Sequence, residues 1–244
     1  MSATLTSANR GHQAANPRAI RGLGDLSARL AGLGAVGFAA VVLLQNVVRG
    51  GTAPANDASA ADVLAHYADD RATTYLLVAT FVLSGVGLAL FLGGTLPRLL
   101  DGERPGWALT GAVGAVGIMA MFAVVVAAEQ ALSIVATGDR PDLGAISALW
   151  AFHNSAFTVL YLSLAVALLG LSRAGVAAGL TPRAFERVAP VGAGLLLAGA
   201  ITGPSIAAGD AMAVFALSFI GFAVWLGFLV STGLRLVRGD RSAS

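Results

Sequence analysis

Six long apolar runs constrain what this chain can fold into more than any other feature. A helix that crosses the hydrocarbon core of a bilayer needs about 20 mostly apolar residues. Six segments meet this requirement: 30–48, 74–96, 107–136, 144–172, 188–208 and 211–234. None alternates with the period of two that is typical of a strand, and only helices or closed barrels satisfy their backbone hydrogen bonds in lipid. The sequence therefore predicts an all-α, polytopic membrane protein, with a six-transmembrane-helix bundle over residues 29–236.

The composition agrees with a location in the lipid bilayer. Of the 244 residues, 57% are hydrophobic and 11% are charged, against about 25% charged residues in soluble proteins. Residues 1–28 are polar and lack the apolar core of a signal peptide, so we expect them, like residues 237–244, to form flexible tails. The chain has no cysteine, which excludes disulfides, thiolate metal ligands and cysteine nucleophiles.

The placement of arginine predicts the orientation of the bundle. All 15 basic residues are Arg. Twelve lie in the two tails and in the 97–106 and 173–187 loops, whereas Arg49, Arg71 and Arg140 fall on the other side. The positive-inside rule then places both termini in the cytoplasm of a cell whose plasma membrane holds the protein. Arginines in short loops fit this role better than nucleic-acid binding. The Lys-free, Ala-, Gly-, Val- and Arg-rich usage indicates a GC-rich bacterial genome.

The loop between the first two spans has helical periodicity of its own. In "SAADVLAHYADD", Ser59 followed by Asp62 resembles a capping box. At 100° per residue one face is apolar and the opposite face is polar, so we expect a short amphipathic helix across the outer end of the bundle. A solvated polar face is one interpretation, and a metal site is the other, because Asp and His at i, i+4 can chelate a metal. The apolar face comprises Ala60, Val63, Leu64 and Tyr67, and the polar face Asp62, His66, Asp69 and Asp70.

Polar side chains from four of the predicted spans fall at one depth, near the outer boundary of the hydrocarbon. Counting at 1.5 Å per residue from the helix ends places them at a similar level. An ionisable residue at such a depth usually faces the bundle interior and has a partner, and we expect Glu129 and His153 to form this pair. Thr158 and Tyr161 continue a polar stripe inward. The group at this level consists of Gln45, Asn46, Glu129, Gln130, His153, Asn154 and Ser205.

This polar level has two interpretations. It is either a structural hydrogen-bond network between helices or a functional pocket that opens outward. A divalent metal is one occupant the residues allow, with His66, Asp69, Glu129 and His153 as the ligands to consider. A bis-His haem could use only His66 and His153, which lie on different segments without a supporting motif, so haem is disfavoured.

Small residues and one proline add detail to the expected helix packing. Glycines recur every third residue at Gly111, Gly114 and Gly117, and small residues let membrane helices approach closely. Pro204 follows Gly203 and cannot donate to the carbonyl of Ala200, so the 188–208 helix should be kinked there.

Several activities are excluded. Without lysine the chain cannot form a retinal Schiff base, and it has no H-E-x-x-H motif, no G-x-S-x-G motif and no nucleotide-binding loop. Two stretches, "ADVLAHYADDRATTYLL" and "LWAFHNSAFTVLYLSLAVALLGLSRA", resemble a set of uncharacterised actinobacterial six-helix integral membrane proteins. This resemblance implies the topology and no particular activity.

Three hypotheses of function follow. The favoured one is a protein that binds or transports a cation or small polar molecule through the outward-facing polar pocket. The second is a membrane-embedded enzyme that uses Glu129 and His153 as acid–base groups or metal ligands. The third is an accessory subunit in which the polar level is purely structural. Beyond the lipid bilayer and such a ligand the sequence indicates no partner, and it leaves the oligomeric state open.

Overall fold

The chain folds into a bundle of long helices. The computed structural model describes residues 17–69 and 71–239, and the described part contains helices and no strand. The helices are α1 (Pro17–Thr52), α2 (Ala60–Asp69), α3 (Arg71–Leu100), α4 (Pro105–Ala136), α5 (Leu143–Ala177), α6 (Phe185–Ile201), α7 (Gly203–Ala207) and α8 (Met212–Arg238). Five of these described helices, α1, α3, α4, α5 and α8, are long and apolar enough to cross a membrane.

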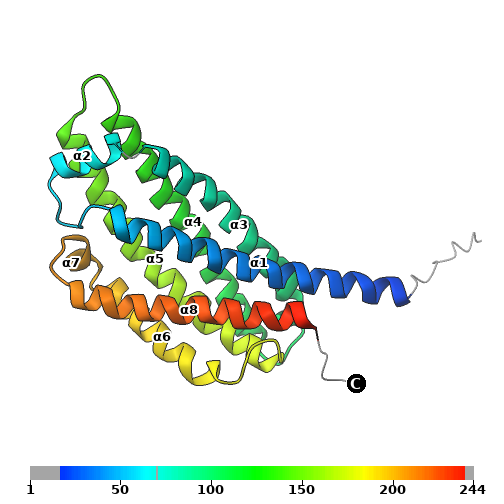
Figure 1. The fold of residues 1–244 in the computed structure, drawn as a ribbon. Helices are drawn as coiled ribbons and strands as arrows, with labels where there is room; N and C mark the ends of the chain where they lie inside the picture. The colour runs from blue at the N-terminus through cyan, green and yellow to red at the C-terminus, as the bar shows by residue number, and fades with distance from the viewer. Residues whose placement is uncertain (1–16, 70, 240–244) are drawn as a thin grey trace, which may run out of the picture.

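The helices are arranged so that the start of α1 and the end of α8 lie at the same end of the bundle (Figure 1). The opposite end carries α2, α7 and the turn between α4 and α5. α1 packs between α3 and α8, while α4 and α5 form an extensive antiparallel pair. We call the end that carries α2 and α7 the α2 end.

The helix boundaries differ most from the predicted ones at the start of α1 and in the expected fifth span. α1 begins at Pro17, so residues 17–28, expected as part of a flexible tail, are helical. Proline is favoured in the first helical turn, where its missing N–H costs no hydrogen bond. The remainder of the expected N-terminal tail, residues 1–16, and residues 240–244 lie outside the described part, as does Asp70.

The expected fifth span, 188–208, is divided in two. α6 ends at Ile201, and a separate short helix, α7, begins at Gly203 with Pro204 in its first turn. Pro204 has no N–H to continue the α6 hydrogen-bond ladder, and the chain resumes with Ile206 N donating to Thr202 O. The 17-residue α6 is therefore shorter than the five helices that meet the length for a membrane span.

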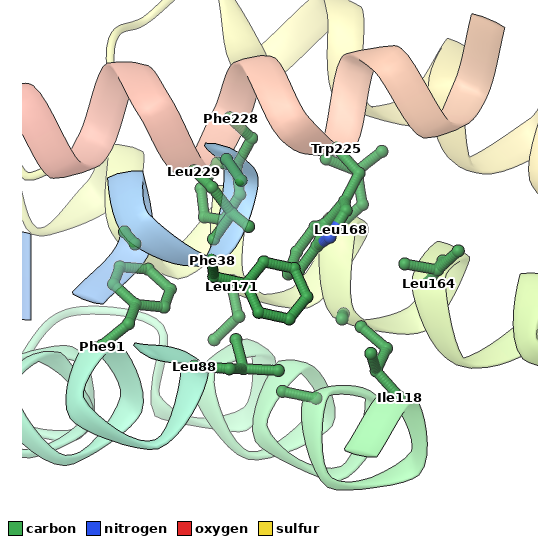
Figure 2. Close-up of a cluster of buried hydrophobic side chains, with 14 of the residues drawn as sticks. Phe38, Leu88, Phe91, Ile118, Leu164, Leu168, Leu171, Trp225, Phe228 and Leu229 are labelled. Atoms are coloured by element: carbon green, nitrogen blue, oxygen red, sulfur yellow. The ribbon is translucent and has the colours of Figure 1, made fainter. Parts of the chain in front are cut away.

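Two apolar clusters hold the bundle together. The larger one runs through the middle, where side chains of α1, α3, α4, α5 and α8 interdigitate (Figure 2). The smaller one lies at the α2 end, where Val63 and Tyr67 of α2 are buried against Leu132, Ile146 and Trp150. Many other large apolar side chains are exposed, among them Val113 on α4 and Ile201 on α6, as expected for a surface that faces lipid.

Glycines permit the closest helix contacts. A Cβ at Gly114 would collide with the backbone of Ala167, and one at Gly111 with the backbone of Leu171. The predicted role of these α4 glycines in packing is thus seen directly at the α4–α5 interface. Gly37, by contrast, faces open space.

Candidate functional site

An ion pair lies inside the α2 end of the bundle. The guanidinium of Arg49, in the last turn of α1, donates through Nη2 to Oε2 of Glu129 at 2.7 Å. On the other side of the carboxylate, Oε1 is 3.3 Å from Nε2 of His153 on α5. The side chains of Arg49, Glu129 and His153 are 17%, 6% and 11% exposed. Three helices thus meet around one buried carboxylate, both of whose oxygens have a cationic or potentially cationic neighbour.

His153 is oriented by two further contacts. Its Nδ1 lies 3.1 Å from Oδ1 of Asn154, and its ring stacks on the indole of Trp150 with the centroids 5.1 Å apart. The amide of Asn154 has a fixed direction, because its Nδ2 donates to the carbonyl of Asn56. Oδ1 is therefore the atom that faces the imidazole, and since a carbonyl oxygen only accepts, the hydrogen belongs to Nδ1 of His153.

Asn56 connects the loop after α1 to two other elements. Its carbonyl accepts from Trp150 Nε1 and from Asn154 Nδ2, both at 3.2 Å. Its own side chain donates to the carbonyl of Ile206 in α7 at 2.8 Å. Asn56 therefore fixes the loop between α1 and α2 against both α5 and α7.

A cavity of about 530 Å³ lies beside this cluster. Its polar lining residues include Asn46, Arg49, His153, Asn154 and Thr158. Its apolar lining residues include Phe157, Ile206, Met212, Phe215 and Phe219. The cavity forms where α1, the 53–57 loop, α5, α7 and α8 leave space between them. Glu129 does not line it.

The predicted polar level is only partly assembled around this cavity. The structure brings Asn46, His153, Asn154 and Thr158 to the cavity wall, and Glu129 directly behind it. Gln45 is buried elsewhere and donates to Leu77 O and Thr80 Oγ1, which joins α1 to α3.

Three further predicted residues lie away from the cavity. Gln130 and Ser205 are exposed. Tyr161 is buried one level deeper, in an apolar slot that shares Phe157 and Phe219 with the cavity, and its hydroxyl has no hydrogen-bond partner.

The residues considered as metal ligands do not form one site. Among the residues that the structure describes, no group of three or more His, Asp or Glu side chains could hold a metal ion. Asp69 is exposed. His66, Tyr67 and Glu129 line a separate void of about 20 Å³, which shares Arg49 and Ala53 with the cavity. Burial raises the pKa of the Tyr67 hydroxyl, and the charge of Glu129 raises it further, so the phenol at this position stays neutral.

Three residues of the site were missed at the sequence level: Arg49, Asn56 and Trp150. Arg49 could have been found, because it follows Gln45 and Asn46 by four and three residues and so lies on the same side of α1. The arginine pattern instead uses Arg49 only as one of the three arginines on the outer side. Asn56 acts mainly through its backbone carbonyl, and a loop sequence carries no signal for that.

Comparison of the chain with protein-family models, curated proteins and solved structures found no match. The resemblance inferred from the two sequence stretches therefore has no support from a matching family.

Proposed function

We propose that the protein is an integral membrane protein that binds a small molecule with a polar group in the cavity at the α2 end. The observation that carries the proposal is the cavity itself, about 530 Å³ with a mostly apolar lining and a few polar side chains. Small-molecule sites are typically concave, about 300–1,000 Å³ in volume, and mostly apolar with a few convergent polar groups. The cavity meets each of these criteria.

We further propose six crossings of the bacterial plasma membrane, with both termini in the cytoplasm. The end of α5 lies near the ends of α3 and α8, because Ala178, Arg98 and Arg235 line one cavity. α7, by contrast, contacts Asn56 at the α2 end. α6 therefore runs the length of the bundle between these ends, although it is shorter than its neighbours. The arginine asymmetry of the loops supports the cytoplasmic placement.

The arrangement favours binding of a polar molecule over the alternatives. A cation would need free carboxylate oxygens, and both oxygens of Glu129 already face Arg49 and His153. An acid–base enzyme would need Glu129 to reach a substrate, and Glu129 does not line the cavity. Transport would need a path onward, and the slot below the cavity holds only about 10 Å³.

A cavity-filling variant tests the proposal. Ala53, directly after the end of α1, lines the cavity, whereas Ala40 is exposed on α1 and does not line it. The protein purified in mild detergent should retain small molecules that mass spectrometry detects after solvent extraction. Ala53→Trp should lose them, and the matched control Ala40→Trp should keep them. Identical extracts from wild-type and Ala53→Trp proteins that are both folded would refute the proposal.

A further inference from the structure

The buried cluster beside the cavity has more donors than acceptors. Arg49 donates through Nη2 to Glu129, but its Nε is buried without a hydrogen-bond partner. Nδ1 of His153 carries hydrogen because it faces the oxygen of the Asn154 amide, and Nε2 lies 3.3 Å from Oε1 of Glu129 but forms no hydrogen bond. The carboxylate of Glu129 is the counter-charge of Arg49, and it does not line the cavity.

No buried carboxylate among the lining residues gives Arg49 a second counter-charge. Asp57 is the acidic residue of the cavity lining, and it is exposed to water, where solvent and salt screen its field. Arg49 is mostly buried, so its charge is screened less. Its unpartnered Nε is a buried donor that an anionic group could satisfy.

From these observations we infer that the cavity binds an amphiphile with a single anionic group, such as a carboxylate, whose charge faces Arg49 and His153. Its apolar part lies against Phe157, Phe215 and Phe219 of the same lining. Arginine presents several N–H donors in a planar fork that matches a carboxylate. This inference rests on the proposed function and names the ligand class for the same cavity.

Trp150 provides the signal for a test, because its indole lines the cavity and a bromine atom quenches tryptophan fluorescence at short range. The protein in phosphatidylcholine nanodiscs would be titrated with 8-bromooctanoate, 8-bromooctylamine and 8-bromooctanol. We expect the carboxylate to quench at a concentration at least about tenfold below that of the amine or the alcohol. Trp150→Phe should remove this saturable component and leave only the quenching of Trp107 and Trp225 that arises from probe dissolved in the bilayer.

The charge-neutral double variant Arg49→Gln/Glu129→Gln supplies the second comparison. Gln is isosteric with Glu129 and is a shorter, uncharged replacement for Arg49, so the variant removes the ion pair without leaving a charge unpaired. The cavity should still bind the alcohol, and the preference for the carboxylate over the alcohol should fall by about tenfold. An unchanged preference, or a wild-type preference for the amine, would overturn the inference and leave the proposed function standing. If none of the probes quenches the fluorescence of Trp150 saturably, both the inference and the proposed function are refuted.

The anionic group could come from a free fatty acid-like molecule or from a lipid headgroup. Repeating the titration with phosphatidylglycerol in the nanodiscs separates these sources. Competition by that lipid would assign the site to a headgroup, and undiminished quenching would assign it to a free carboxylate. Either result keeps the anionic class that the inference names.

Discussion

Glu129 is a carboxylate in a place where one would be costly without partners, and Arg49 and His153 supply them from two other helices. The Coulomb attraction within such a group roughly offsets the cost of removing the charges from water. The group therefore contributes little to net stability as long as it is complete. Removing one member leaves a buried charge without its counter-charge, and this lowers the stability of the fold.

This asymmetry predicts the behaviour of a double-mutant cycle. Arg49→Leu or Glu129→Leu alone should lower the free energy of unfolding by about 3–5 kcal/mol, because each leaves a buried charge unpaired. The double variant should recover most of that loss. Unfolding by SDS in mixed micelles, followed by circular dichroism, measures all three variants. If the single losses simply add up in the double variant, the two residues do not act as a pair.

The sequence predicted two of the three members of this group, Glu129 and His153. Counting along the spans placed Glu129 and His153 at one depth, and their nearest atoms lie 3.3 Å apart. Arg49 was missed because an arginine near a predicted helix end reads as a loop residue. The structure extends α1 to Thr52, which keeps the long Arg49 side chain on the helix and turns it inward.

At the scale of elements, α2 closes the end of the bundle with a small apolar cluster. Val63 is fully buried against the ends of α4 and α5, while Ala65 on the same helix is exposed. The helical periodicity of the α2 segment predicted which of its side chains share a face. It could not predict which side chains they would meet, since that depends on how α2 lies across the ends of α4 and α5.

A charge on the buried face of α2 should detach it. Val63→Asp should lower the free energy of unfolding by more than about 2 kcal/mol, because it removes a buried valine and places a carboxylate in an apolar contact. Ala65→Asp adds the same charge to the exposed face and should have little effect. The thermal midpoint in detergent compares the two, and equal midpoints would mean that α2 does not contribute to the stability of the bundle.

The α4–α5 interface gives a second prediction at this scale. Gly114→Ala adds one methyl group where the backbone of Ala167 already lies, so the helices must separate, at a cost of about 1–3 kcal/mol. Gly37→Ala adds the same methyl in open space and should be neutral or slightly stabilising, since alanine is the better helix former. SDS unfolding distinguishes them. A Gly114→Ala protein as stable as Gly37→Ala would show that the close approach is unnecessary.

At the scale of the whole molecule, the apolar runs predicted where the long helices lie. α4 ends at Ala136 and α5 begins at Leu143, within one residue of the expected limits. The cavity could not be predicted in this way. It depends on the gap between α1 and α5 and on the 53–57 loop, which Asn56 fixes to α7 across 150 residues of sequence. Hydropathy contains no information about such contacts.

Membrane orientation is tested on the whole molecule by cysteine labelling. The chain has no cysteine, so a single introduced one reports its own position. Glu103 and Asp139 are both exposed, at opposite ends of α4. Asp139→Cys should react with an impermeant thiol reagent in intact cells, whereas Glu103→Cys and Ser2→Cys should react only after lysis. The reverse pattern would invert the orientation.

The break between α6 and α7 also sets the bilayer thickness that the helices on each side of the bundle can match. The 17 residues of α6 extend over about 26 Å, and the 35 residues of α5 over about 52 Å, at 1.5 Å per residue. A bilayer core measures about 30 Å. A long helix adjusts by tilting or by projecting into water, whereas a short one is accommodated by thinning of the bilayer, by snorkelling of flanking side chains or by association with other helices. In the proposed six-span arrangement, thinning would compress the acyl chains beside α6 and leave those beside α5 unchanged, so the protein would fit best in a membrane that is already thin.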